Sequence, residues 1–292
     1  MNLAKLAKHY RISHGGHFRL KDVDPGDTLG LKLEHEAAKE MLHKGVERLA
    51  ELQERLYADD RWALLIIFQA MDAAGKDGAI KHVMSGVNPQ GCRVSSFRAP
   101  SDEDLKHDYM WRCVARLPQS GEIGIFNRSY YEETLVVRVH QELLQRQHLP
   151  KQLLGKKIWK QRYHDIRDME GYWARNAIVT CKFFLHVSKA EQRRRFLSRL
   201  DEPDKHWKFS ARDLAERQHW AKYAEAYQDM IRGTATPEAP WHVIPADNKW
   251  FTRLVVAATI IDRLEALDLK YPEPDALKLR QLRAAKRALA KG

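Results

Sequence analysis

The chain has 292 residues with a net charge of +11, and 44% of the residues are hydrophobic. This length suits one large α/β domain or two small ones, and the hydrophobic content excludes a disordered chain. The large basic charge favours a polyanionic partner such as nucleic acid, anionic membrane, nucleotide or polyphosphate. No apolar stretch is long enough to span a membrane and the first residues lack a signal-peptide core, so we expect a cytoplasmic protein. Three widely separated cysteines predict free thiols: Cys92, Cys113 and Cys181.

Residues 1–60 are expected to form an N-terminal arm and helix. Turn signals, His-Gly-Gly at 14–16 and Asp-Pro-Gly at 24–26, predict an irregular arm over residues 1–32. Residues 33–58 place apolar side chains in one stripe at helical spacing, which predicts a helix used for packing or for oligomer contacts. We expect a homo-oligomer, either a dimer or a tetramer.

Residues 62–83, WALLIIFQAMDAAGKDGAIKHV, are the segment around which the rest is organised. The apolar run from Trp62 to Phe68 predicts a buried parallel strand, and a small-residue turn with a lysine leads into a helix. This is the plan of a phosphate-binding loop, in which backbone N–H groups, the helix N-terminus and a lysine all attract phosphate. The candidate phosphate-binding residues are Ala74, Gly75, Lys76, Asp77 and Gly78.

The loop departs from the Walker A pattern at two positions. Ala70 replaces the first glycine, and Asp77 replaces the Ser or Thr whose hydroxyl would hold magnesium. Asp72 is an extra carboxylate within the loop, and a carboxylate beside phosphates is repulsive unless a cation lies between them. Asp72 is therefore a candidate magnesium ligand. The alternative is an ordinary strand–turn–helix with a solvated lysine.

A second strand is predicted at Cys92–Phe97, followed by a helix around Leu105–Leu117. The Ser101–Asp104 sequence resembles a capping box that starts this helix. In one interpretation, some cations of this region line an anion channel. In the other, they are part of a helix face on which polar, charged and apolar side chains are mixed, without a binding role. The candidates for a polyanion track are Lys81, Arg98, Arg112 and Arg116.

The third strand, Glu122–Phe126, ends in the polar pair Asn127 and Arg128, with Glu132 a few residues later. Ligand-binding groups of α/β sheets gather at the carboxyl ends of strands. Asn127 stands where a Walker B acid would, and it can bind magnesium directly or through water. Arg128 suits bidentate phosphate binding, although it could instead cap the sheet edge.

The remaining elements are a helix at 156–177, strands at 178–187 and 241–245, and a closing helix at 250–268. Between them, an arginine-rich helix, the segment LDEPDKHWKFS at 200–210 and another capped helix resemble a kinase lid at about 190–215. A solvated basic hairpin is the alternative. Residues 61–270 are thus expected to form the kinase domain, and residues 271–292 form a basic tail. The lid cations that could reach phosphates are Arg195, Arg199, Lys205 and Lys208.

Four motifs together resemble the polyphosphate kinase 2 family, from about residue 10 to about 270. They are FQAMDAAGKDG (68–78), FNRSYYEE (126–133), the arginine-rich helix at 191–199 and DEPDKHWKFS (201–210), in this order. Asn127, where aspartate is common in the family, together with Glu132, is similar to the class III branch. The resemblance implies a three-layer α/β/α P-loop kinase sandwich with a five-stranded parallel sheet and a helical lid.

The resemblance also implies a reaction: reversible phosphoryl transfer between inorganic polyphosphate and AMP or ADP, which forms ADP and ATP. Mg²⁺, or Mn²⁺ in its place, would be held by Asp72 and Asn127. The expected catalytic residues are Asp72, Lys76, Asn127, Arg128, Glu132, Arg195 and Arg199, and the expected polyphosphate contacts include Lys81, Arg112, Lys205 and Lys208.

Two other functions remain open at this level. An ATP-using nucleoside-monophosphate kinase shares the fold, but the missing Walker A hydroxyl and the extra loop aspartate argue against it. A nucleic-acid-binding module would explain the basic charge, but no recognition motif is present and aromatics do not interleave with the basic tail. We therefore expect no nucleic-acid partner.

Overall fold

The structure is a computed structural model that describes residues 3–31 and 35–290. The helices and strands in chain order are α1 (Leu3–His9), β1 (Arg11–Ile12), α2 (His35–Asp59), β2 (Ala63–Ala70), α3 (Lys76–Val83), β3 (Cys92–Ser96), α4 (Trp111–Val114), β4 (Ile123–Asn127), α5 (Val136–Val139), α6 (Ile158–Arg175), β5 (Ile178–His186), α7 (Lys189–Asp201), α8 (Ala211–Gln218), α9 (Trp220–Thr234), β6 (Trp241–Pro245), α10 (Lys249–Glu265) and α11 (Ala276–Leu289). Among several short 3₁₀ helices, η3 (Asp104–Lys106), η4 (Tyr130–Thr134) and η7 (Pro203–Lys208) matter for the site.

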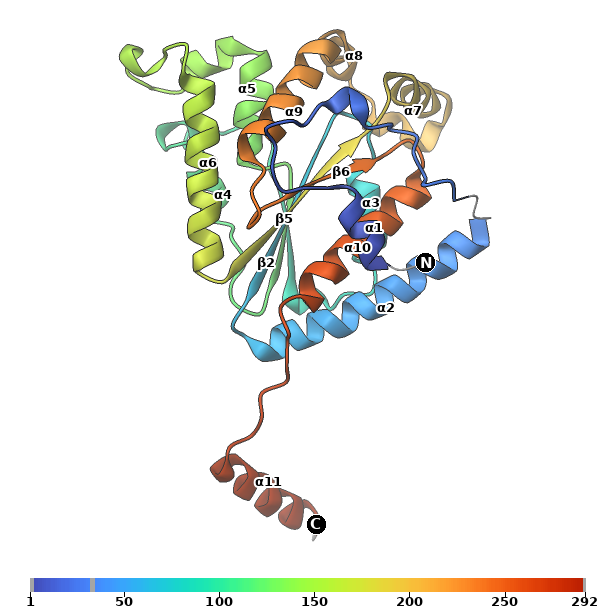
Figure 1. Cartoon of the computed structure of the whole chain (residues 1–292), viewed down its shortest axis with the longest axis vertical. Helices are drawn as coiled ribbons and strands as arrows, with labels where there is room; N and C mark the ends of the chain where they lie inside the picture. Colours follow the sequence, from blue (N-terminus) through green and yellow to red (C-terminus); the bar gives the residue numbers. More distant parts are fainter. Residues whose placement is uncertain (1–2, 32–34, 291–292) are drawn as a thin grey trace.

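One sheet organises the fold, with the strand order β1-β6-β5-β2-β4-β3 (Figure 1). β2 lies between β5 and β4, and the five strands β2 to β6 run parallel to one another. β2 is buried along nearly its whole length, as its continuous apolar sequence predicts. Because the strands are parallel, β2, β4 and β5 end at the same edge of the sheet, and this edge carries the site.

Helices cover both faces of the sheet (Figure 1). One hydrophobic cluster joins the sheet to α1, α2, α3 and α10, and a second cluster on the other face joins it to α6, α9 and the tyrosines of η4. The predicted three-layer α/β/α sandwich is therefore confirmed.

The prediction of an irregular arm over residues 1–32 is wrong for its first part. α1 buries Leu6 in the core, and Tyr10 follows it with 5% of its surface exposed. The strand β1 then pairs with β6 in the antiparallel sense, which adds a sixth strand to the five predicted. Val243 N–H donates to Tyr10 O at 3.0 Å. The open edge of β6 thus pairs with a segment that is too short to be recognised as a strand from its own sequence pattern.

The helix predicted around Leu105–Leu117 is instead two short pieces, η3 and α4. Asp108 accepts a hydrogen bond from Met110 N at 2.9 Å through its side chain, and this Asx turn competes with helix continuation. The reciprocal capping bonds predicted between Ser101 and Asp104 are present, at 2.8 and 3.1 Å.

The basic C-terminal segment forms the helix α11, which lies apart from the domain at the end of an extended linker (Figure 1). All residues of α11 are exposed, and Asp275 caps its first turn by accepting from Lys278 N at 2.7 Å. The three cysteines are free thiols, as predicted. Within the described ranges, no helix has the length and apolar character that crossing a membrane requires.

Candidate active site

The turn between β2 and α3 has the backbone of an anion-binding loop. Ala73 and Gly75 both have positive φ angles, 61° and 103°, and Gly75 is the N-cap of α3. The left-handed conformation is unfavourable for alanine, so the surrounding contacts must hold it in place. Alternating backbone conformations of this kind turn successive N–H groups into a concavity that suits phosphate.

Lys76 lies at the first position of α3 and reaches back across the turn. Its Nζ donates to Ala70 O at 3.2 Å. Burial lowers the pKa of Lys76, and the nearby Arg128 lowers it further, while the carboxylates of Asp72, Glu132 and Asp77 act in the opposite direction. A bound phosphate would add negative charge to this site and stabilise the ammonium form.

Arg128 joins the two expected catalytic carboxylates. Its guanidinium lies 3.3 Å from Asp72 Oδ1 and 3.5 Å from Glu132 Oε2. Glu132 is the main cause that raises the pKa of Arg128. Arg128 has a φ of 66°, and its N–H still donates to Phe68 O at 3.0 Å. This strained position at the end of β4 brings Arg128 and the nearby Glu132 together with Asp72 of the phosphate loop, which is distant in the sequence.

Asn127 and Asp77 form a contact that the sequence did not reveal. Asn127 Nδ2 donates to Asp77 Oδ1 at 2.7 Å, which joins the end of β4 to the first turn of α3. The residue in the Walker A hydroxyl position and the residue in the Walker B position are therefore neighbours. This pairing orients the amide so that Nδ2 faces the carboxylate.

A cavity of about 890 Å³ opens beside Asp72, Arg128 and Glu132. Its walls come from the 98–112 segment, η4, α6, α8 and α9. Arg112 is one of its cations and donates to Arg98 O at 2.8 Å. The lining cations that the fold brings together include Arg98, Arg112, Arg128, Arg146, Arg162, Arg212 and Arg217.

Most of the expected lid cations are paired with acids of the lid itself. Arg199 lies 3.5 Å from Asp213, and Lys205 forms an ion pair with Glu202. Burial raises the pKa of Asp213, and the charge of Asp72 raises it further. The side chain of Lys208 lies outside the described residues. Lys81 is exposed on α3 and is not among the described residues that line the cavity.

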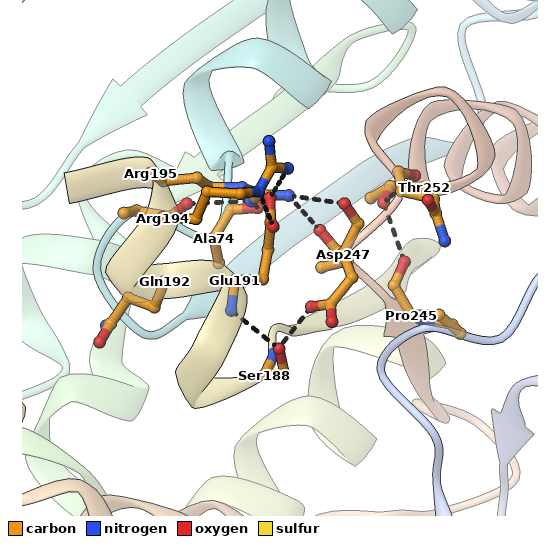
Figure 2. Close-up of polar contacts among 12 residues, drawn as sticks. Ala74, Ser188, Glu191, Gln192, Arg194, Arg195, Pro245, Asp247 and Thr252 are labelled. Carbon is orange, nitrogen blue, oxygen red and sulfur yellow. Dashed lines mark hydrogen bonds and ion pairs between the residues drawn. The ribbon is translucent and has the colours of Figure 1, made fainter. Parts of the chain in front are cut away.

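Arg195 was expected to be a lid residue that contacts the transferring phosphoryl group, and the structure places it at the base of the lid with its side chain buried. It is 8% exposed, and its guanidinium bonds carbonyl oxygens of the phosphate loop and of the segment after β6 (Figure 2). The reason is tertiary: α7 packs against these two loops, so the side chain points into the protein.

A buried ion pair behind the site was also missed. Lys182 on β5 and Glu170 on α6 are 0% and 1% exposed, and their charged atoms lie 2.6 Å apart. The hydroxyls of Tyr130 and Tyr131 each donate to Glu170 at 2.7 Å. The signal in the sequence was Lys182 itself, a charged residue within the apolar strand IVTCKFFLHV.

The donor set of the site suits a hard divalent cation. Asp72 supplies a carboxylate and Asn127 an amide oxygen, and they lie at the carboxyl ends of the neighbouring parallel strands β2 and β4. No cluster of three or more His, Cys, Asp or Glu able to hold a metal occurs in residues 3–31 and 35–290. Mg²⁺ commonly takes one or two carboxylates and completes its shell with phosphates and water, so the residues present fit such an ion.

Transfer of a phosphoryl group demands positioning and neutralisation of negative charge more than a strong base. A positively biased loop, an arginine fixed between two acids and a cation-lined cavity meet these two demands. The fold and the site therefore define a phosphotransferase of the P-loop kinase class.

Comparisons with known proteins narrow this class to one family. The family model "Polyphosphate kinase 2 (PPK2)" matches residues 32–272. The chain is 50% identical over 253 residues to an ADP-polyphosphate phosphotransferase of Rhodopseudomonas palustris, covering 86% of this chain and 88% of the relative. It is 45% identical over 268 residues to an AMP/ADP-polyphosphate phosphotransferase of Meiothermus ruber, covering 92% and 96%.

A solved structure agrees with the sequence comparisons. The crystal structure of polyphosphate kinase 2 from Arthrobacter aurescens superimposes with a TM-score of 0.86 at 38% identity, covering 98% of this chain and 96% of that one. This chain belongs to the polyphosphate kinase 2 family.

Proposed function

We propose that this protein transfers phosphoryl groups reversibly between inorganic polyphosphate and AMP or ADP, with Mg²⁺, or Mn²⁺ in its place. The observation that carries the proposal is Arg128, held between Asp72 and Glu132 at the mouth of the cavity in a polyphosphate kinase 2 chain. The names of the two relatives share polyphosphate and differ in the acceptor, ADP in one and AMP or ADP in the other. Asn127 with Glu132 favours the class III branch, and hence both acceptors.

In this proposal, the acceptor phosphate needs no base because it is already an anionic nucleophile. Its oxygen attacks the terminal phosphorus of polyphosphate, a new P–O bond forms, and the bridging P–O bond breaks to leave a chain shorter by one phosphate. Lys76 and Arg128 hold the phosphates that are exchanged. A magnesium ion bound through Asp72 and Asn127 would neutralise phosphate charge.

Glu132 has two roles in the proposal. Its carboxylate orients Arg128, from which it lies 3.5 Å away, and it contributes to the choice of acceptor. Because Glu132 lines the cavity beside Arg128, an acceptor with one phosphate fewer would bring less charge against this carboxylate. Comparing AMP with ADP in a Glu132→Gln variant tests this role, and an unchanged ratio of the two rates would contradict it.

The lid at about 190–215 is proposed to close over the phosphates. In the structure, the Arg199–Asp213 and Lys205–Glu202 pairs offset part of the charge of this segment. Binding of a polyanion would compete for these cations and order the segment around it. Hydrogen exchange over residues 200–210 should slow when polyphosphate and Mg²⁺ are added, and unchanged exchange would argue against closure.

The direct test incubates the protein with Mg²⁺, polyphosphate and either AMP or ADP, and follows the nucleotides by chromatography. We expect AMP to become ADP and ADP to become ATP. Conversion of ADP alone would contradict the class III assignment. Replacing polyphosphate by ATP, with AMP as acceptor, separates this activity from that of an ATP-using nucleoside-monophosphate kinase.

We further propose a cytoplasmic homo-oligomer, a dimer or tetramer, without a nucleic-acid partner. Light scattering after size-exclusion chromatography measures the oligomeric state. Filter binding of DNA and RNA over a salt series tests for a nucleic-acid partner, and tight binding that survives at moderate salt would contradict the proposal that there is none.

A further inference from the structure

The guanidinium of Arg195 has all five of its N–H donors engaged within the protein. Nε donates to Glu191 Oε1 at 2.6 Å. Nη1 donates to the carbonyls of Ala73 at 3.0 Å and Ala74 at 2.7 Å. Nη2 donates to the carbonyls of Ala246 at 2.5 Å and Asp247 at 3.1 Å. Arginine has five such donors, so a phosphate could bind this side chain only by displacing one of these partners.

A second residue of α7 holds the same loop. Gln192 is 3% exposed, and its Nε2 donates to Asp72 O at 2.9 Å. Together, Gln192 and Arg195 bind the carbonyls of three consecutive loop residues, Asp72, Ala73 and Ala74. α7 therefore holds the part of the phosphate loop in which Ala73 has its unfavourable positive φ.

Holding these carbonyls also orients the amides that follow them. In a trans peptide unit, the C=O and the next N–H point in nearly opposite directions. With the carbonyls of residues 72–74 drawn toward α7, the N–H groups of residues 73–75 turn away from it. The N–H of Ala74 bonds Met71 O at 3.2 Å within the turn. The orientation of the others suits an anion on the side of the loop opposite α7.

The helix α7 is itself anchored at its N-terminus. Ser188 N donates to Asp247 Oδ1 at 2.8 Å, and Ser188 Oγ accepts from Glu191 N at 3.0 Å (Figure 2). Asp247 and Ala246 follow β6, so the first turns of α7 are fixed to the sheet edge. The base of the lid and the phosphate loop are thus parts of one hydrogen-bonded unit, with Arg195 at its centre.

We infer that Arg195 and Gln192 are positioning residues of the phosphate loop, and that Arg195 does not contact the transferring phosphoryl group. The inference rests on the proposed function for its kinetic test, while its structural test is independent of any reaction. The link between the lid and the loop depends on the planar, forked guanidinium of Arg195, which bonds several carbonyls at once. The ammonium group of a lysine cannot reproduce this geometry.

Arg194 provides a matched control. It precedes Arg195, bonds the same Glu191 through Nε at 2.6 Å and Nη2 at 2.7 Å, and has a side chain that is 74% exposed (Figure 2). The bonds of Arg194 to Glu191 lie within α7, whereas the Nη1 and Nη2 groups of Arg195 bond the phosphate loop and the segment after β6. Exchanging either arginine for lysine keeps the charge of the helix and removes the fork.

The first measurement is turnover of polyphosphate with ADP. We expect Arg195→Lys to lower kcat/KM by about 100-fold or more, the size of effect that follows loss of aligned backbone donors. Gln192→Leu should lower it by about 10-fold, and Arg194→Lys should leave it within about twofold of wild type. Activity of Arg195→Lys within about twofold of wild type would overturn the inference.

The second measurement is hydrogen exchange of the Ala74 amide in the ligand-free protein. Ala74 is 3% exposed and its amide is hydrogen-bonded, so its exchange reports how firmly the loop is held. We expect faster exchange in Arg195→Lys and Gln192→Leu and no change in Arg194→Lys. If Arg195→Lys loses turnover while Ala74 exchanges as in wild type, Arg195 acts on the substrate directly and the inference is wrong.

Two further outcomes keep the tests decisive. If Arg195→Lys does not fold, the exchange and turnover of Gln192→Leu decide alone, and wild-type behaviour of that variant overturns the inference. If the wild-type protein has no activity with polyphosphate, the proposed function fails, and the Ala74 exchange of the three variants still decides the role of Arg195.

Discussion

The buried pair of Lys182 and Glu170 offers a quantitative test of how the site is supported. Lys182 Nζ donates to Glu170 Oε2 at 2.6 Å, to Tyr131 Oη at 3.0 Å and to Thr234 O at 2.9 Å. Tyr131 lies three residues after Arg128, so the pair ties the segment that carries Arg128 to β5 and α6. Burial lowers the pKa of Lys182, and Glu170 opposes this by favouring the ammonium form.

Lys182→Met would leave the Glu170 carboxylate buried without its cation, and Glu170→Leu would leave the ammonium without its anion. Breaking a buried pair on one side costs about 3–5 kcal/mol, so we expect each variant to lose about that much free energy of unfolding. Replacing both residues, as Lys182→Met with Glu170→Leu, removes both charges together. The tyrosine hydroxyls and the Thr234 carbonyl then lose partners, at about 1–3 kcal/mol each. The double variant should therefore lose less than the sum of the two single variants.

The assay is urea unfolding followed by tryptophan fluorescence. Trp241 is a local reporter, because Lys182 Nζ lies 5.1 Å from its ring centroid. The exposed pair of Lys44 and Glu40 is the control: its charged atoms are also close, at 2.7 Å, but both side chains are largely solvated. Lys44→Met should leave the midpoint unchanged. Losses in Lys182→Met no larger than in this control, or a double variant equal to the sum, would refute the reasoning.

Lys76→Ala and Asp72→Asn should each lower turnover by about 10²–10³-fold, because each removes charge that stabilises the reacting phosphates. The circular dichroism spectrum should stay unchanged, and near-normal turnover of either variant would contradict the role proposed for that residue. Truncation after Tyr271 removes α11, which is exposed along its length, so turnover and most of the salt dependence of polyphosphate affinity should persist; loss of the salt dependence with retained turnover would make the tail the polyanion anchor. Burial lowers the pKa of His242 to about 3. As the pH falls, the unfolded chain protonates this imidazole before the folded chain does. The free energy of unfolding should therefore fall by about 1.6 kcal/mol between pH 6.5 and pH 5 on account of His242. His242→Gln should flatten that part of the pH profile in urea unfolding, and an unchanged slope would contradict the assignment.

Elements with a strong local pattern could be predicted from the sequence. The run from Trp62 to Phe68 could only be a buried strand, and the observed β2, Ala63–Ala70, differs by one or two residues at each end. Gly75 and Lys76 after that strand predicted the turn into α3. The polar pair Asn127 and Arg128 after an apolar run predicted a sheet edge with ligand-binding groups. In these cases, the period of the side chains and the special residues of the turn carry the information.

Side-chain partners, very short strands and the exact point at which a helix breaks could not be predicted in this way. Two arginines adjacent in the sequence, Arg194 and Arg195, differ in exposure and in hydrogen-bond partners because α7 turns one toward solvent and the other toward the phosphate loop. The strand β1 has too few residues to show a pattern, and it exists because the edge of β6 was open to pairing. The break at Asp108 depends on one side-chain hydrogen bond that competes closely with helix continuation.

The sequence by itself thus determined the five parallel strands of the sheet, the phosphate loop and the class of chemistry, since each rests on neighbouring residues and on backbone preferences. The tertiary structure alone decided which charged groups meet. Arg128 lies between Asp72 and Glu132, Asn127 bonds Asp77, and Lys182 finds Glu170 across the core. A buried charge is stable only with a partner, and that partner is chosen by the packing of elements distant in the chain, which no local pattern records.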